Sequence, residues 1–206
     1  MTPTLTQLIW RVLVPVLAVD QMLKIWVKTS FTYGESMGFV PGLLELRFIE
    51  NPGAAFGAAL PGETGKLVLT SFRIVAAIAI GLYIARRVRE EAPNGLLYTL
   101  TFIWAGAIGN IVDSVFYGKV FSASEYTFHS SKLAEWMPES GGYGPWFQGK
   151  VVDMFHFVVE WPSWFPIESW AGKEVFPPIW NLADAAIAVS VIWILIKQRS
   201  YFPTIR

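Results

Sequence analysis

Two aspartates lie in apolar surroundings, where a carboxylate is energetically costly. Asp153 is flanked by Val152 and Met154, and Asp184 stands at the start of an apolar run that is nearly long enough to cross a membrane. An ionised carboxylate at the centre of a membrane helix costs about 2.5–3.5 kcal/mol on insertion scales. Such groups persist where they pair with a partner, line a polar cavity or take part in chemistry. For Asp153 taken alone, a helix cap or a surface carboxylate explains the residue as well as a functional role does.

Two Asn-x-x-Asp pairs add to this pattern, Asn110 with Asp113 and Asn181 with Asp184. Residues three apart share a helix face, so each amide can orient its carboxylate, or a partner, by hydrogen bonding. Polar residues within a membrane must face protein or water, which places both pairs inside a helical bundle. The competing interpretation is interhelical hydrogen bonding that only holds the bundle together.

Other ionisable groups have more modest interpretations. Asp20 and Lys24 are four residues apart on one helix face, which favours a local ion pair or a brace for a nearby outer loop. His156 follows Asp153 by three residues, but no serine stands in a convincing position to complete a triad. Arg73, in the middle of an apolar run, can snorkel or pair with an acid, and we assign it no catalytic role.

Composition narrows the class of protein. The chain has 206 residues, of which 53% are hydrophobic and only 16% are charged, whereas soluble domains carry about 25% charged residues. The chain has sixteen basic and sixteen acidic residues. It therefore lacks the excess of basic residues that is typical of proteins that bind nucleic acids. The chain has no cysteine and only two histidines, His129 and His156, which excludes cysteine chemistry and leaves too few histidines for a convincing metal cluster.

Four stretches approach the roughly 20 apolar residues that a membrane span requires. They are Leu8–Val27, Leu67–Ala85, Leu96–Tyr117 and Ile179–Ile196. Arginines follow the second stretch and Lys197 follows the fourth, so the positive-inside rule places both termini and the 86–95 loop in the cytoplasm. The first stretch contains charged residues and lacks a following small-residue cleavage site, so we expect a retained helix rather than a signal peptide.

The outer loops, at 28–66 and 118–178, are expected to hold structure of their own. Leu44–Glu50 largely alternates apolar with charged residues, as a half-exposed strand does, and Asn51-Pro52-Gly53 predicts a turn after it. The aromatic end of the second loop, Val151–Phe165, is expected to lie on the membrane surface or to re-enter it. The predicted fold class is an all-α membrane protein, with residues 1–206 forming a single integral membrane domain.

Five segments, in order over most of the chain, resemble the motifs of the lipoprotein signal peptidases, or signal peptidase II. They are Asp20–Lys24 (DQMLK), Phe48–Gly57 (FIENPGAAFG), Gly106–Asp113 (GAIGNIVD), Gly149–Met154 (GKVVDM) and Asn181–Asp184 (NLAD). The resemblance implies an aspartyl endopeptidase of the bacterial cytoplasmic (inner) membrane, a multi-pass protein with its active site toward the outer face. It would cleave diacylglyceryl-modified prolipoproteins before the lipidated cysteine, without a metal or other cofactor. Its partners would be these prolipoproteins and membrane lipids, and a monomer is expected.

The same resemblance implies roles for individual residues. Asp153 and Asp184 would be the catalytic dyad, and Asp20, with Lys24, would brace the extramembrane part, which in this family is a small strand-built β-cradle. The residues expected to support the site or bind substrate are Asn51, Gly53, Asn110, Asp113, Asn181 and Ala183. Small residues at 183, 185 and 186 would leave room for the peptide near Asp184.

The chain departs from the family pattern in two places. The family often has an arginine directly after the third-span aspartate, where this chain has Ser114. Asp113 and Asp153 are also separated by a longer link than is usual, and residues 120–148 are read as an outer-face helical or loop insertion that forms an interfacial element or lid.

Three other functions compete with this interpretation. A small transporter or proton-coupled channel would use the intramembrane acids as relay groups, but no repeats or broken helices are visible. A non-enzymatic assembly factor would stay functional without the aspartates. A serine or zinc intramembrane protease would need a base for Ser114 or a His-Glu-x-x-His segment, and the sequence has neither.

Overall fold

Helices form at each of the four apolar stretches. In the computed structural model of the protein, residues 1–53, 62–127 and 130–202 are described. The first helical stretch runs from α1 (Leu5–Leu8) through a π-helical turn, η1 (Ile9–Leu13), into α2 (Val14–Ser30). Next come α3 (Gly62–Arg89) and α4 (Asn94–Val112), which continues through η2 (Asp113–Tyr117) and α5 (Gly118–Val120). The last helix is α6 (Leu182–Tyr201).

Some of the sequence predictions fall on residues that are not described. These are the last four residues of the outer-loop motif (54–57), together with His129. Among the described residues, two helices are long and apolar enough by composition to cross a membrane, Thr64–Arg89 and Asn94–Val120. Of the other two stretches, α2 carries Asp20, Lys24 and Lys28, and α6 carries Asp184, Lys197 and Arg199.

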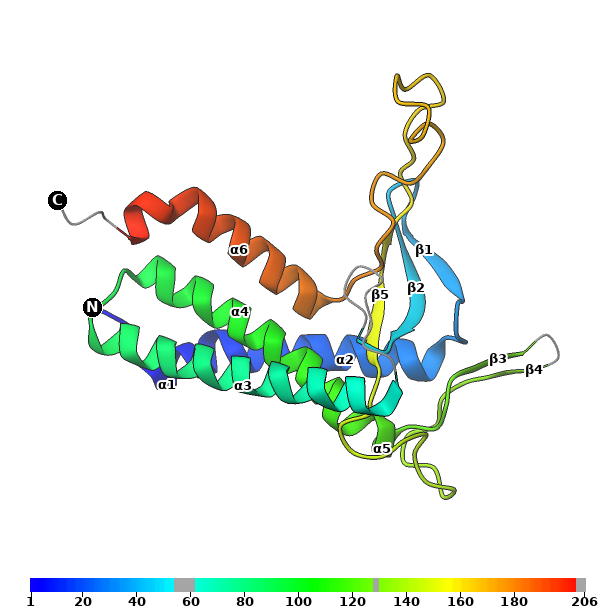
Figure 1. Ribbon diagram of the computed structural model, residues 1–206, viewed down its shortest axis with the longest axis horizontal. Coiled ribbons are helices and arrows are strands. Elements are labelled where there is room, and N and C mark those ends of the chain that lie inside the picture. The colour runs from blue at the N-terminus through cyan, green and yellow to red at the C-terminus, as the bar shows by residue number, and fades with distance from the viewer. Residues whose placement is uncertain (54–61, 128–129, 203–206) are drawn as a thin grey trace.

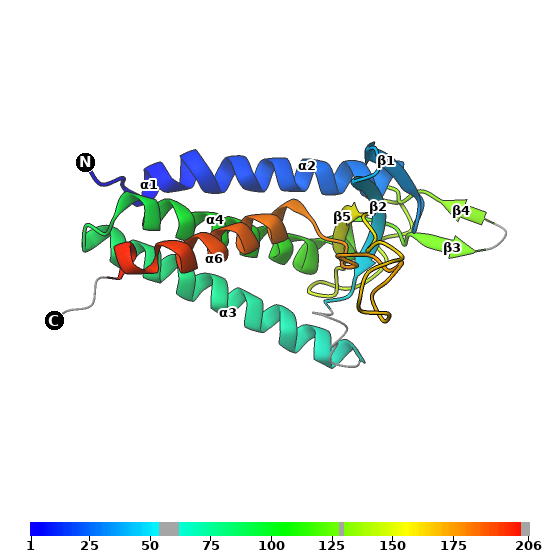
Figure 2. The ribbon, with the colours of Figure 1, turned by 90° about the horizontal axis from the view of Figure 1, so that it is seen from above.

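The helices lie lengthwise beside one another, and α4 packs against α2, α3 and α6 (Figure 1). The start of α1 and the end of α6 lie at the same end of the bundle, as the view from above also shows (Figure 2). Gly106 permits the close approach of α4 and α6, since a Cβ atom there would lie 2.4 Å from the carbonyl oxygen of Ala183. This approach brings the start of α6 against the polar face of α4.

A three-stranded antiparallel sheet caps the other end of the bundle. Its order is β1 (Ser36–Val40), β2 (Leu44–Asn51) and β5 (Val151–Phe157), and the prediction of a small strand-built element is confirmed to this extent. The alternation read at Leu44–Glu50 is confirmed, because Leu46, Phe48 and Glu50 are the buried residues of β2. Val151–Phe157 is a strand of this sheet rather than a re-entrant or surface segment, and its first four residues are all buried.

The insertion differs from its prediction. Within its described part, residues 120–148 contain a short β-hairpin, β3 (Glu125–Thr127) with β4 (Ser130–Lys132), and loops, with no helix after α5 ends at Val120. The β-hairpin projects beyond the sheet, roughly along the direction of the helices (Figures 1 and 2).

A buried lysine fastens the insertion to the sheet. The ammonium of Lys28, which is fully buried, pairs with the carboxylate of Glu50 and donates a hydrogen bond to Ser124 Oγ at 3.0 Å. The rings of Phe121 and Tyr143 from the insertion lie 5.3 and 5.1 Å from this ammonium. Such cation–π contacts add to the ion pair when the cation is desolvated, so the insertion completes the core beneath the sheet.

Candidate active site

Asp153 is held in the middle of β5 by two amides. It lies opposite Ile49 of β2 and is 3% exposed. Its Oδ1 accepts a hydrogen bond from Nδ2 of Asn181 at 2.6 Å, and its Oδ2 accepts one from Nδ2 of Asn51 at 3.2 Å. Asn51 is the last residue of β2, so the strand pairing and the helix start both converge on this carboxylate.

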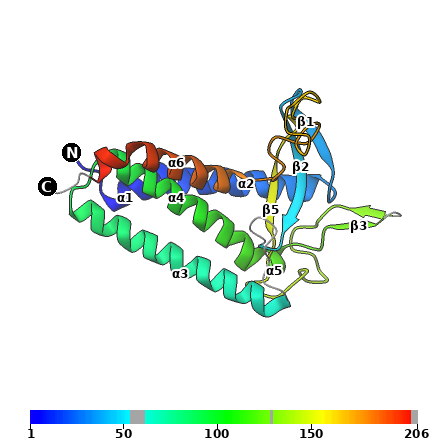
Figure 3. The same cartoon turned by 45° about the horizontal axis from the view of Figure 1, so that its top comes forward.

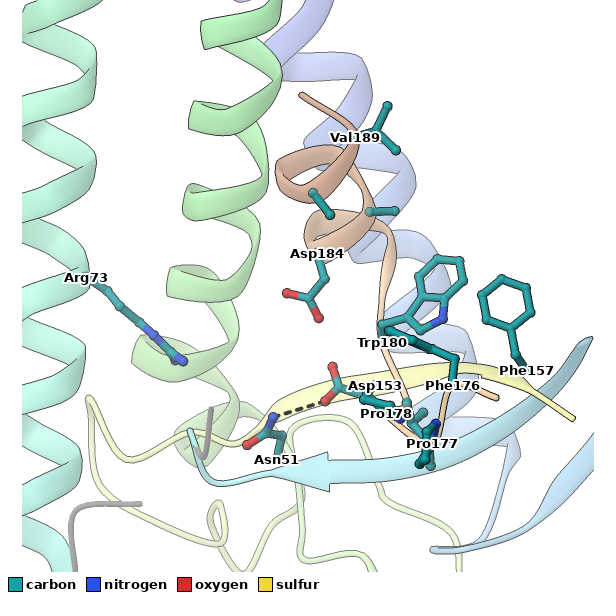
Figure 4. Close-up of a pocket in the computed structure, with 13 residues that line it drawn as sticks. Asn51, Arg73, Asp153, Phe157, Phe176, Pro177, Pro178, Trp180, Asp184 and Val189 are labelled. Carbon is teal, nitrogen blue, oxygen red and sulfur yellow. Dashed lines mark hydrogen bonds between the residues drawn. The ribbon is translucent and has the colours of Figure 1, made fainter. Parts of the chain in front are cut away.

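Asp184 is held at the start of α6. Asn181 caps the helix by accepting a hydrogen bond from the backbone N–H of Asp184 at 2.9 Å, while the Asp184 side chain bonds back to the N–H of Asn181. The other carboxylate oxygen of Asp184 accepts a hydrogen bond from Nδ2 of Asn110 at 2.8 Å. The Asn181 side chain therefore contacts both aspartates, and the two carboxylates point toward one another (Figure 4).

A buried network fixes the backbone beside each of these aspartates. Asp113 accepts a hydrogen bond from the N–H of Val152, the residue before Asp153, at 3.2 Å. Asp20 accepts one from the N–H of Ala183, the residue before Asp184, at 3.0 Å. Both carboxylates also pair with the Lys24 ammonium at 2.9 Å. All four aspartates of the chain thus belong to one connected arrangement, with two facing a pocket and two behind them.

The rear network contains the predicted ion pair. Asp20 and Lys24 pair with each other, and they contact the start of α6 and the end of α4 directly. Their link to the predicted outer loop 118–178 is indirect, since Lys24 pairs with Asp113, which accepts a hydrogen bond from Val152 of β5. Gln21, which was not singled out, donates hydrogen bonds to Asp20, Asp113 and the carbonyl of Gly109. Its position within the Asp20–Lys24 segment was the only signal that could have identified it.

A pocket of about 850 Å³ opens in front of the two aspartates. Asn51, Asp153 and Asp184 line it together with Arg73, which reaches in from α3 on the opposite side (Figure 4). The rest of its wall is apolar and comes from the end of β5, residues 176–180 and α6, with Phe157, Phe176, Trp180, Ala185 and Ala188 among the lining residues. The pocket combines two acids and one cation with an apolar wall.

Arg73 is the residue that sequence reasoning missed. Its guanidinium donates a hydrogen bond to Ser114 Oγ at 3.3 Å, and that hydroxyl donates to the carbonyl oxygen of Asn110 at 2.8 Å. Ser114 therefore directs an arginine from another helix into the pocket. A lone arginine within an apolar stretch was the available signal, but the sequence did not indicate which residues it would face.

Two other predicted site residues support the pocket from outside. Ala183 is fully buried against α4 and does not line the pocket, whereas Ala185 and Ala188 do. Gly53 has a backbone φ of +105°, and a Cβ atom there would lie 2.7 Å from the Leu69 side chain, so both conformation and space favour glycine. Its N–H bonds to Oδ1 of Asn51 at 2.8 Å, which fixes the amide that faces Asp153.

His156 does not contact Asp153. Its two ring nitrogens lie 2.9 Å from the Glu45 carboxylate and 3.3 Å from that of Glu174. It therefore ties β2 and β5 to residue 174, which agrees with a structural role. Among the described residues, no group of three or more histidine, cysteine, aspartate or glutamate side chains is arranged to hold a metal ion.

The Asp153 carboxyl group titrates well above the usual range of an aspartate. Burial, which has the largest effect, and the neighbouring charge of Asp184 together raise the pKa of Asp153 to about 7, against the hydrogen bonds from Asn181 and Asn51, which lower it. Two carboxylates that face the same space resist simultaneous ionisation. At neutral pH the pair can therefore retain one proton, which is the state that acid–base hydrolysis requires.

Comparison with known proteins places this arrangement in a family. The sequence profile described as Signal peptidase (SPase) II matches residues 12–199. The chain belongs to the signal peptidase II family. A lipoprotein signal peptidase of Porphyromonas gingivalis is 43% identical over 190 residues, which cover 89% of this chain and 79% of that protein. One from Amoebophilus asiaticus is 31% identical over 207 residues, covering 95% of this chain and 80% of that protein.

Solved structures agree at the level of the fold. A bacterial membrane enzyme determined by the in meso method at 2.3 Å resolution superposes with a TM-score of 0.60 at 21% identity, over 94% of this chain and 88% of that one. A second, at 1.9 Å resolution, gives a TM-score of 0.56 at 23% identity. The likeness to these enzymes is one of fold, and the signal peptidase II family to which the chain belongs is one of peptidases.

Proposed function

We propose that this signal peptidase II is an aspartyl endopeptidase that removes the signal peptide from diacylglyceryl-modified prolipoproteins, cleaving before the lipidated cysteine. The observation that carries this proposal is the placement of Asp153 and Asp184 on the wall of one pocket, with Asn181 in contact with both. The family supports peptide hydrolysis, and the pocket supplies two carboxyl groups with which to perform it, of which Asp153 has a raised pKa.

In the proposed mechanism, Asp153 carries the shared proton and Asp184 is ionised. Asp184 takes a proton from a water molecule as the water oxygen bonds to the scissile carbonyl carbon, while protonated Asp153 donates a hydrogen bond to the carbonyl oxygen. The carbon–nitrogen bond then breaks, and the proton held by Asp184 passes to the leaving amine of the lipidated cysteine. The amides of Asn51, Asn181 and Asn110 hold both carboxyl groups in position throughout.

Arg73 is the cation of the pocket wall and is proposed to contact substrate. Its guanidinium faces the two acids from α3, so a peptide in the pocket would lie between them (Figure 4). Arginine donates several hydrogen bonds in a fixed planar geometry, which suits peptide carbonyl oxygens. The apolar wall beside α6 would take the signal helix and acyl chains, for which burial is favourable by about 0.8 kcal/mol per CH₂ group.

The proposed location is the bacterial cytoplasmic membrane, crossed four times by a monomer with both termini in the cytoplasm. The basic residues in the last turns of α3 and α6 support this orientation, because they lie at the same end of the bundle as the start of α1. The pocket then lies near the outer face, where a lipid-anchored substrate is available within the same membrane.

The test is cleavage of a lipidated prolipoprotein by the purified enzyme in lipid. Asp153→Asn and Asp184→Asn should each lower kcat by roughly 10³-fold or more, since each removes an acid–base group. Glu139→Gln, a change at an exposed carboxylate of the insertion, is the matched control and should cleave normally. Normal cleavage by either folded aspartate variant would refute the assignment, as would a product that does not begin at the modified cysteine.

A further inference from the structure

Residues 158–178, between β5 and α6, form a structured extension that the proposed chemistry does not use. We call it the aromatic hairpin. Backbone hydrogen bonds join its two sides: the N–H of Val175 bonds to the carbonyl of Val159 at 2.8 Å, and that of Trp161 to the carbonyl of Lys173 at 2.8 Å. Its base is fastened through Glu174, which lies 3.3 Å from the buried His156 of β5.

The distal part of the aromatic hairpin is a cluster of rings. The ring centres of Trp161 and Phe165 are 4.3 Å apart, and the ring of Trp170 lies 5.5 Å from Trp161 and is parallel to that of Phe165 within 2°. Aromatic pairs at these separations stabilise one another beyond simple burial. The segment is thus held in shape by its own side chains, even though it projects away from the core.

The same segment exposes large apolar side chains. Trp164 is 78% exposed, and Trp170 and Ile167 are 48% and 44% exposed. A rigid element that leaves so much apolar surface in water is unusual for a soluble surface and indicates an apolar partner. Three of the ten tryptophans of the chain lie in these 21 positions, and tryptophan is enriched where proteins meet the membrane–water interface.

The position of the aromatic hairpin identifies that partner. It leaves the sheet steeply across the direction of the helices and extends past the outline of α6 (Figures 1 and 3). If the helices cross the bilayer, as the proposed function requires, the hairpin runs along the outer membrane surface over the lipid beside α6. Its stem is continuous with the pocket, since Phe157 and Phe176 line both the pocket and an apolar cavity of about 370 Å³ with Val159 and Val175.

We propose that the aromatic hairpin is a membrane-binding element whose exposed residues Trp164, Ile167 and Trp170 lie in the lipid headgroup region next to α6. The interaction is apolar rather than electrostatic, because the segment carries three glutamates and one lysine and has no basic cluster to attract anionic lipid. It therefore persists at high salt. Its place beside the pocket lets it hold the sheet against the membrane at the side where a lipid-anchored substrate would approach.

The absence of cysteine from the chain makes a direct test practicable. Trp164, Ile167 and Trp170 are replaced by cysteine one at a time, labelled with a nitroxide and reconstituted in phosphatidylcholine–phosphatidylglycerol vesicles. Lys132→Cys in β4 is the control, because the β3–β4 hairpin projects along the helices, away from the bundle (Figure 2). Collision rates with oxygen, which concentrates in lipid, and with a water-soluble nickel complex are then measured by electron paramagnetic resonance.

We expect the ratio of oxygen to nickel collisions at one or more of the three hairpin positions to exceed that at position 132 several-fold, at low and at high salt. Equal ratios at all four positions would overturn the proposal. Prolipoprotein cleavage by the unlabelled variants in the same vesicles separates this inference from the proposed function. Cleavage with a water-exposed hairpin refutes only the membrane contact, whereas a lipid-exposed hairpin without cleavage by wild type refutes only the peptidase assignment.

Discussion

The amide of Asn51 should set the alkaline limit of activity. As pH rises through the pKa of Asp153, about 7, the shared proton is lost and the rate of cleavage should fall. Asn51 donates a hydrogen bond to the Asp153 carboxylate at 3.2 Å and so favours its ionised form. Replacing Asn51 by alanine removes that donor, which raises the pKa of Asp153 and moves the alkaline limb to higher pH.

The expected size of this shift follows from the geometry. Hydrogen bonds to charged groups contribute about 1.5–3 kcal/mol, and 3.2 Å is at the long end of the N–H···O range, so the lower value applies. Since about 1.4 kcal/mol corresponds to one pH unit, the limb should move up by roughly one unit. The shorter bond from Asn181, at 2.6 Å, remains and keeps the carboxyl group in place.

The assay is kcat/KM for a lipidated prolipoprotein across pH 5–10, in a detergent whose headgroup does not titrate. Asn51 also fixes the turn at Gly53, and loss of that contact should lower the rate equally at every pH without moving the limb. Asn94→Ala is the matched control, because its amide only approaches the Met1 carbonyl at 3.5 Å, far from the pocket. An unmoved limb, or one displaced to lower pH, would show that Asp153 is not the group whose proton activity requires.

Two further predictions concern stability and the pocket cation. Between the unfolded pKa of an aspartate, near 4, and the folded value of about 7, folded Asp153 binds more protons than unfolded Asp153, so the free energy of unfolding falls as pH rises, by at most about 4 kcal/mol. Asp153→Asn should therefore have a higher melting temperature than wild type at pH 8, and the increase should be smaller at pH 5. Melting curves followed by tryptophan fluorescence measure both temperatures. A melting temperature lowered by the same amount at pH 5 and pH 8 would contradict this prediction. Arg73→Gln should lower kcat/KM by roughly 10- to 100-fold, as expected for a lost charged hydrogen bond. Arg73→Lys should lower kcat/KM by less than Arg73→Gln does. Adding Ser114→Arg to Arg73→Gln should restore activity, because Ser114 Oγ lies 3.3 Å from the Arg73 guanidinium. A wild-type kcat/KM for Arg73→Gln would show that Arg73 has no role in the reaction.

Local patterns in the sequence predicted the elements that carry the site. Apolar length located the helices, and alternation at Leu44–Glu50 located β2, because each of these signals depends only on neighbouring residues. The prediction failed for Val151–Phe157, since a strand buried on both faces has no alternation and is not distinguishable from an apolar helix or surface segment by period. It also missed the hairpin in the insertion. Ser124, the residue before that hairpin, contacts Lys28 and Glu50 from distant elements, and contacts between distant elements leave no local pattern in the sequence.

By itself, the sequence determined which polar residues had to be accounted for, because a carboxylate or amide in an apolar stretch is costly wherever the chain places it. Only the tertiary structure decided what each of them faces. Asp153 and Asp184 come together in the pocket, while Asp20 and Asp113, of the same chemical type, accept backbone hydrogen bonds behind it. Arg73 joins the pocket from a separate helix. The physical reason is that hydrophobicity and period are properties of short segments, whereas the partner of a buried charge is set by how those segments pack.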